Sequence, residues 1–339
     1  MTQAHLTRRR FATILGGAFL LSISVLLLAP LVGPIELSLP TALSDGSSLD
    51  AEILLRARLP RVLFAALVGG ALAVSGVVFQ AILRNPLASP FTLGVSGGGS
   101  LGAVLAILLG WEVSFHGISF LPLASLAGAT TVVLIVYSLS KTQRHFSPLT
   151  LLLSGVVLNY ICAALILLVH YFSNFTKSFM MMRWMMGALD VYDFGVVMTL
   201  LPFILIGLAL LLRYSRYLNV LSAGEDWAAS RGVQVERLVT LQYFGASLLT
   251  GSVVAYCGPI GFVGLIVPHI LRLLLGADHR ILLPTAFLMG GTFLVICDTI
   301  ARTVLAPTEI PVGIFTSILG GPFFLWLLLH RRKELFFGG

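Results

Sequence analysis

The chain of 339 residues is 58% hydrophobic and only 10% charged, and its mean hydropathy is +1.00. Soluble globular domains are about half apolar and about a quarter charged, so this composition excludes a soluble domain, a disordered chain and a disulfide scaffold. The net charge of +7 comes from 21 basic and 14 acidic residues, and their distribution favours membrane topology over nucleic-acid binding.

Ten apolar segments follow one another along the chain, and each is near the length at which a helix crosses a bilayer. We predict spans at residues 11–33, 62–83, 91–110, 118–139, 147–170, 191–212, 238–257, 260–275, 281–305 and 311–329. No soluble domain fits between them. The sequence therefore predicts an all-α, polytopic membrane protein with a single transmembrane domain over residues 1–339.

The first span follows Thr7-Arg8-Arg9-Arg10-Phe11, which resembles a twin-arginine export signal. The apolar run is nevertheless long enough to cross a membrane, and Leu28-Ala29-Pro30 is a poor cleavage site. We expect an uncleaved first span.

Basic residues divide unequally between the two sides of the ten-span topology. One side, which carries both termini, holds fifteen Lys and Arg residues, and the other holds six. The positive-inside rule assigns the richer side, and so both termini, to the cytoplasm. The six outward basic residues are Arg56, Arg58, Arg61, Lys177, Arg183 and Arg302.

Three of the outward arginines stand at the ends of spans. Arg58 and Arg61 precede the second span, and Arg302 ends the ninth. A guanidinium group binds a carboxylate through two parallel hydrogen bonds, so the set predicts a docking site for an acidic partner. For any one of them alone, an interaction with lipid phosphate is the alternative.

Asp298 is the one carboxylate deep in a late span, which makes it a candidate proton relay. Arg302 lies four residues further on, on the same helix face, and this spacing predicts a local ion pair. A proton-coupled secondary transporter that uses Asp298 is therefore the alternative from another functional class. A purely structural membrane anchor is a third hypothesis.

Motifs for catalysis and phosphate binding are missing. The glycine-rich stretch 94–102 is not followed by Lys-Ser or Lys-Thr, and we expect it to permit close helix packing. The sequence contains no Walker motif and no HExxH. We predict no catalytic residue and no metal site, and we expect the three cysteines, which lie in apolar runs, to be buried thiols: Cys162, Cys257 and Cys297.

The cytoplasmic loop between the sixth and seventh spans predicts a short helix, at about 222–232. Ser222 and Glu225 have the spacing of a capping box, and Gly232 suits a left-handed stop. The segment carries Trp227 and small alanines, which is typical of a helix that docks in a groove of a partner. Its acidic residues argue against the alternative of a helix on the lipid surface, because the inner leaflet is itself negative.

Several motifs together resemble one family, the permease subunits of type II ABC importers for iron–siderophore complexes, haem and vitamin B12. They cover nearly the whole chain: Arg58-Leu59-Pro60-Arg61, Asn85-Pro86-Leu87-Ala88, Gly258-Pro259-Ile260-Gly261-Phe262-Val263-Gly264-Leu265, Pro268 to Arg272, Asp278-His279-Arg280, Asp298 to Arg302, and Glu309-Ile310-Pro311-Val312-Gly313 with Gly320.

The resemblance implies a homodimer of ten-span permeases in a bacterial inner membrane. It also implies a cytoplasmic ABC ATPase dimer that holds the ATP and magnesium, so that this chain has no cofactor of its own, and a substrate-binding protein that docks outside. Arg58, Arg61 and Arg302 match the arginines that receive the binding protein. The coupling helix of the family is matched by Gly224, Glu225, Ala228 and Gly232, whereas Arg231 replaces the leucine that is common in the family.

The resemblance further implies a translocation pathway along the dimer interface, lined by the fifth and tenth spans. Small or weakly polar residues occur there, and ordinary helix packing is the alternative explanation for them: Ser154, Asn159, Thr316 and Ser317. A ferric siderophore is the expected cargo, with vitamin B12 and haem as alternatives. The expected surroundings are membrane lipid, and no nucleic acid is expected as a partner.

Overall fold

The computed structural model describes residues 8–111, 114–115, 118–141, 147–191 and 193–337. Ten helices correspond in chain order to the ten predicted apolar segments. They are α1 (Arg8–Leu28), α4 (Leu59–Ile82), α5 (Val95–Leu109), α6 (Phe120–Ser140), α7 (Pro148–Phe172), α9 (Phe194–Arg213), α12 (Val235–Cys257), α13 (Val263–Leu275), α14 (His279–Ala301) and α15 (Val312–Phe337). The predicted all-α class is confirmed.

Within the described residues, seven of these helices are long and apolar enough to cross a membrane: α1, α4, α6, α7, α9, α12 and α14. The apolar parts of α5, α13 and α15 are shorter, and end at Leu109, Leu275 and Leu327. In water-free hydrocarbon a helix satisfies its own backbone hydrogen bonds, which explains why apolar segments of this length adopt this structure. The chain is a multi-pass membrane protein.

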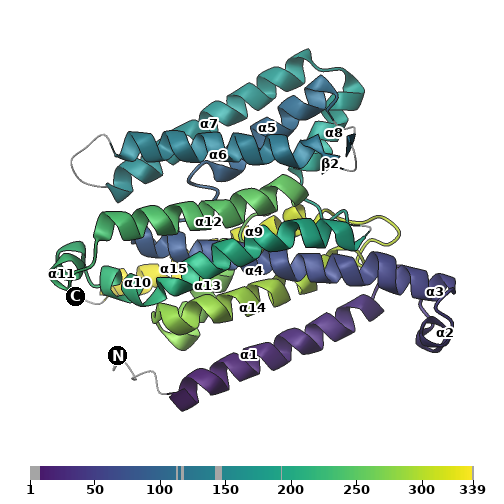
Figure 1. The fold of residues 1–339 in the computed structure, drawn as a ribbon, viewed down its shortest axis with the longest axis horizontal. Coiled ribbons are helices and arrows are strands. Elements are labelled where there is room, and N and C mark those ends of the chain that lie inside the picture. The colour runs from purple at the N-terminus through teal and green to yellow at the C-terminus, as the bar shows by residue number, and fades with distance from the viewer. Residues whose placement is uncertain (1–7, 112–113, 116–117, 142–146, 192, 338–339) are drawn as a thin grey trace.

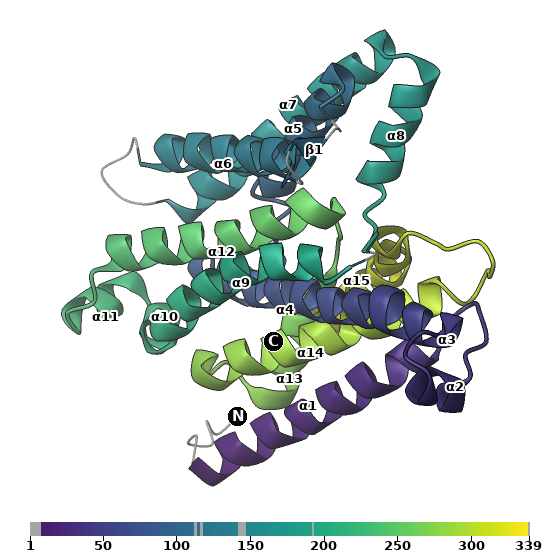
Figure 2. The ribbon, with the colours of Figure 1, turned by 45° about the vertical axis from the view of Figure 1, so that its right-hand side comes forward.

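Shorter elements join the long helices. They are η1 (Ala29–Leu31), α2 (Leu39–Ser44), α3 (Leu49–Glu52), the π-helical η2 (Ile53–Arg58), α8 (Phe175–Met185), α10 (Ser215–Ser222) and α11 (Glu225–Ser230). Two antiparallel two-residue strands, β1 (Ser114–Phe115) and β2 (Ile118–Ser119), form a small hairpin. Figure 2 shows α8 descending from the end of α7 toward the start of α15.

Helix α4 is the central element and the most buried of the candidate spans. It packs against α14, α12, α13 and α9, while α5, α6 and α7 form a layer above and α1 lies along the lower edge (Figure 1). The start of α1 and the end of α15 lie toward the same end of the molecule as α10 and α11 (Figure 1). This is the end that the count of basic residues assigns to the cytoplasm.

Glycines allow the central helices to approach closely. A Cβ atom on Gly76 of α4 would overlap the carbonyl oxygen of Gly264 on α13. In the glycine-rich stretch, a Cβ on Gly98 would lie 2.6 Å from the carbonyl oxygen of Gly128 on α6. The predicted packing role of residues 94–102 is therefore confirmed.

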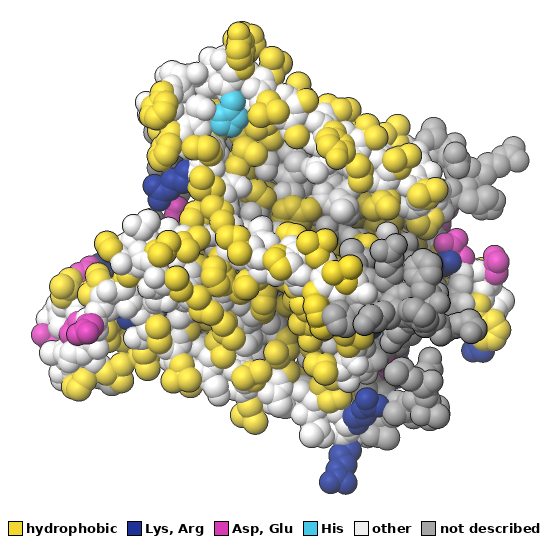
Figure 3. Space-filling model, turned by 180° about the vertical axis from the view of Figure 1, so that it is seen from behind, with side chains coloured by type: hydrophobic (Ala, Val, Ile, Leu, Met, Phe, Trp, Pro, Cys, Tyr) yellow, Lys and Arg dark blue, Asp and Glu magenta, His cyan; other side chains and the backbone are white. Residues whose placement is uncertain are grey.

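Hydrophobic side chains cover much of the face seen in Figure 3, whereas most of the charged side chains visible there lie toward its two ends. Because lipid tails are apolar, this is the surface that a bilayer requires of a spanning protein. The three cysteines are at most 4% exposed, as predicted.

Candidate functional site

An ion-pair network joins α4 and α14 at the end opposite α11. Arg61 lies in the first turn of α4, and its Nη2 and Nε atoms donate to the Asp298 carboxylate at 2.9 and 3.0 Å. Its Nη1 atom donates to Glu309 at 2.7 Å, in the loop between α14 and α15. The side chain of Asp298 is only 2% exposed. A buried carboxylate needs such a bidentate partner, because an unpaired charge at this depth is very costly.

The predicted pair between Asp298 and Arg302 is wrong, because Arg61 holds Asp298 instead. Arg302 is the C-cap residue of α14, and its guanidinium turns to the end of α1, where Nη2 donates to the Ala29 carbonyl at 2.8 Å. The spacing of four residues places two side chains on one helix face, but it does not decide which neighbouring helix each one meets.

Arg58 is also buried, at 5% exposure. Its Nη1 atom donates to the carbonyls of Pro30 and Leu31 at 3.1 and 3.3 Å, and Nη2 donates to that of Ile35. Arg58 and Arg302 therefore hold the segment that follows α1, whereas Arg61 keeps a partly exposed side chain. The structure gathers all three arginines at the predicted outer end, and their role in docking stays a prediction.

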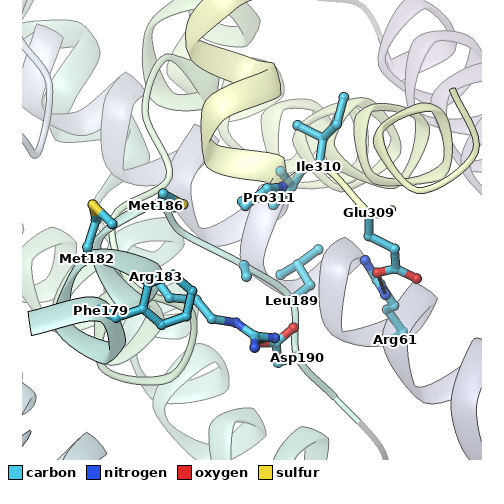
Figure 4. Close-up of a pocket in the computed structure, with 12 residues that line it drawn as sticks. Arg61, Phe179, Met182, Arg183, Met186, Leu189, Asp190, Glu309, Ile310 and Pro311 are labelled. Carbon is cyan, nitrogen blue, oxygen red and sulfur yellow. Dashed lines mark hydrogen bonds and ion pairs between the residues drawn. The ribbon is translucent and has the colours of Figure 1, made fainter. Parts of the chain in front are cut away.

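A cavity of about 300 Å³ opens beside Arg61, between α8 and the start of α15. Figure 4 shows Arg61 with Glu309 on one side of this cavity and Arg183 with Asp190 on another. The Arg183 pair is loose, at 3.7 Å. Sequence reasoning missed Asp190 and Glu309 as partners of arginines, because they come from loops whose position depends on the whole fold.

The loop between α9 and α12, which we predict to be cytoplasmic, contains two short helices rather than one. Ser222 is the last residue of α10, and its Oγ donates to the Leu218 carbonyl at 2.8 Å, so the predicted capping box is wrong. A hydroxyl that bonds its own preceding turn is not free to cap the next helix. Gly224, with φ 136°, interrupts the helical backbone between α10 and α11.

Helix α11 has buried and exposed side chains. Ala228 is fully buried, whereas Trp227 is 52% exposed. The guanidinium of Arg231 lies over the Trp227 ring, 4.6 Å from its centre. Glu225 pairs with Arg84 at 3.2 Å. Gly232 adopts φ 78°, which confirms the predicted left-handed stop.

The side chain of Asn219 links α10 to the start of α14 through hydrogen bonds. Its Nδ2 atom donates to Asp278 at 2.7 Å, and its Oδ1 accepts from the backbone N–H of His279 at 2.7 Å. Burial of Asp278 raises its pKa, but the hydrogen bonds from Arg280 and Asn219 outweigh this effect and lower the pKa to about 2. The motif Asp278-His279-Arg280 signalled this corner in the sequence, whereas nothing there singled out Asn219.

The four predicted pathway residues are not brought together within one chain. Ser154 and Asn159 lie on α7, which packs on α5 and α6, whereas Thr316 and Ser317 lie on α15, which packs on α13 and α14. Figures 1 and 2 both show α7 and α15 in separate parts of the molecule. Thr316 and Ser317 donate to the Gly313 carbonyl at 3.1 and 2.7 Å. Their role in a pathway stays a prediction.

Known proteins match this chain along its length. The chain is 38% identical to the ABC transporter permease protein YvrB of Bacillus subtilis, over 98% of this chain and 97% of that protein. It is 38% identical to the hemin transport system permease protein HmuU of Yersinia pestis, over 95% and 96% of the two chains. It is 45% identical to the cobalamin import system permease protein BtuC of Halobacterium salinarum, over 81% and 73%.

The fold has a close solved counterpart. A metal-chelate type ABC transporter in an inward-facing conformation superposes with a TM-score of 0.82 and 33% identity, over 94% of this chain and 99% of that one. The sequence model of a family described as "FecCD transport family" matches residues 13–330. This chain therefore belongs to the FecCD transport family of ABC importer permeases.

Proposed function

We propose that this chain is a single permease domain, residues 1–339, that works as a homodimer in a bacterial inner membrane and imports a metal chelate, with a ferric siderophore as its cargo. The observation that carries the proposal is the near full-length match, in sequence and fold, to a metal-chelate type ABC transporter. ATP and magnesium belong to a separate cytoplasmic ATPase dimer, and a substrate-binding protein delivers the cargo. Ser154, Asn159, Thr316 and Ser317 line the pathway once two copies meet.

Transport in reconstituted vesicles tests this proposal. Proteoliposomes with the permease, its ATPase and its binding protein are supplied in parallel with a ferric siderophore, haem and cobalamin. We expect ATP-dependent uptake of the ferric siderophore that survives a protonophore. Uptake of only haem or cobalamin would contradict the proposed cargo. Uptake driven by a proton gradient without ATP would contradict the proposed mechanism and favour the transporter that uses Asp298.

We further propose that α11 is the helix that contacts the ATPase, since its exposed Trp227 and its buried Ala228 suit a helix seated in a groove. Replacing Gly232 with Val should lower substrate-stimulated ATP hydrolysis several-fold while membrane insertion persists. A β-branched residue disfavours φ 78°, so the end of α11 must shift.

Gly110→Val is the matched control for this prediction. Gly110 also has a left-handed φ, 73°, and open space around it, but it lies at the far end of α5. If both variants hydrolyse ATP like the wild type, α11 does not carry the coupling.

The binding protein is proposed to dock at the end of α4 that carries Arg58, Arg61 and Arg302. Of these three arginines, Arg61 has the most exposed side chain, and Glu309 accepts a hydrogen bond from its Nη1 atom at 2.7 Å. A carboxylate of the partner would take the place of Glu309. Arg58 and Arg302 support this corner through the backbone carbonyls that they bind.

Glu309→Gln is therefore expected to tighten docking, because it weakens an internal competitor for Arg61. The affinity of the binding protein for the permease in nanodiscs measures this, at low and high salt. Glu52→Gln is the matched control, since Glu52 is an exposed carboxylate paired with Arg56 on the same outer segment. An equal gain from both variants would indicate general charge repulsion rather than competition at Arg61.

A further inference from the structure

Arg84 is one of two non-glycine residues with a left-handed backbone among the described residues, at φ 49°. The N–H of Asn85 donates to the Gln80 carbonyl and the N–H of Arg84 donates to that of Ala81, at 3.2 and 3.3 Å. These two bonds form a Schellman motif, which ends a helix and normally carries glycine at the position of Arg84. An arginine here is disfavoured by its Cβ atom, so its side chain is the feature that calls for an explanation.

The side chain of Arg84 reaches the helix proposed to contact the ATPase. Its Nη2 atom lies 3.2 Å from Glu225 Oε1, and the two side chains are 40% and 42% exposed. An exposed ion pair of this kind contributes little to global stability. It does fix the first residue of α11 to the end of α4, and α11, with six residues, is too short to hold its position by itself.

Helix α4 extends this connection to the opposite end of the molecule. It runs without interruption from Leu59 to Ile82 and is buried along most of its length against four other helices. Arg61 in its first turn holds Asp298 and Glu309, and Arg84 follows its last turn. An unbroken helix of 24 residues is a rigid element that can carry coupling between its two ends. A displacement of one end of α4 is therefore transmitted to its other end.

We propose that Arg84 is a positioning residue that couples α11 to α4, so that a movement of α11 reaches the outer end of the permease through α4. This inference rests on the proposed function, because it takes α11 as the ATPase contact. Arg84 is not among the residues proposed to line the pathway. It acts through Glu225, and its unfavourable backbone conformation is maintained because the guanidinium must stand at that point.

Arg84→Gly separates this role from a structural one. Glycine is favoured at a left-handed C-terminal position, so the variant relaxes the backbone while it removes the guanidinium. We expect an unchanged or higher melting temperature and unchanged assembly with the ATPase. The amount of cargo moved per ATP hydrolysed should fall about fivefold or more, the lower end of typical coupling strengths. Arg84→Lys, which keeps the charge, should recover part of that loss.

Lys141→Ala is the matched control. Lys141 pairs with Glu236 at 3.7 Å, and both side chains are exposed, but neither residue belongs to α4 or α11. This variant should transport like the wild type. All measurements use the full-length permease in proteoliposomes with its ATPase and binding protein.

Two results would overturn the inference. One is wild-type transport per ATP in Arg84→Gly, which would mean that the pair transmits nothing. The other is a melting temperature that falls together with transport in Arg84→Gly, which would make Arg84 a structural cap. A wild-type permease without ATP-driven transport would instead contradict the proposed function itself, and this outcome is distinct from both.

Discussion

Replacement of Arg61 with Met is expected to destabilise the permease by about 3–5 kcal/mol. Arg61 gives Asp298 two hydrogen bonds, at 2.9 and 3.0 Å, and the carboxylate is 2% exposed. Without the guanidinium, Asp298 remains as an uncompensated charge among packed helices, where neither water nor lipid can solvate it. Denaturant titration of the purified chain in detergent measures the loss.

The double variant Arg61→Met with Asp298→Leu should regain most of that stability. Replacing both members of a buried pair by apolar residues of similar size is often neutral, because no charge is left to desolvate. Arg56→Met is the control, since Arg56 is 78% exposed in its pair with Glu52 and should change stability by less than about 1 kcal/mol. A fully stable Arg61→Met single variant would mean that Asp298 does not depend on this pairing.

Replacement of Gly76 with Leu is expected to prevent normal packing of α4 on α13. Even the Cβ atom of the new side chain would overlap the carbonyl oxygen of Gly264, so a backbone has to move and not only a side chain. Extra atoms in a packed core cost about 1–3 kcal/mol when side chains can adjust. Here we expect at least the upper part of that range, together with loss of transport.

Gly17→Leu on α1 is the control for this variant. A Cβ atom on Gly17 meets nothing within 4 Å, so the substitution should be tolerated. Leucine also has a higher helix propensity than glycine, which stabilises α1 slightly. Melting temperatures and size-exclusion profiles of the two variants make the comparison. Similar profiles for Gly76→Leu and for the wild type would show that α4 and α13 can separate without penalty.

Much of the fold follows from local patterns. Every apolar segment predicted from hydropathy corresponds to one helix, because the length and apolarity that a bilayer demands are properties of a continuous stretch of sequence. The left-handed stop at Gly232 is local in the same sense, since it depends on the conformational freedom of one residue.

The pairing of charges did not follow from local patterns. The spacing of Asp298 and Arg302 favoured a pair within one helix, yet Asp298 binds Arg61, 237 residues away in the chain. Arg58 and Arg302 looked like exposed arginines, yet both are buried against carbonyls after α1. Ser222 had the spacing of a cap, yet it closes α10.

The sequence by itself determined that this protein lies in a membrane, which segments form its apolar helices, and which family it resembles. Those conclusions depend on composition, on hydropathy along the chain and on motifs. Only the tertiary structure decided which carboxylate each arginine meets and which helix ends stand together. The physical reason is that a desolvated charge must find an opposite charge or a carbonyl wherever the packing of helices brings one, and that packing depends on the whole chain.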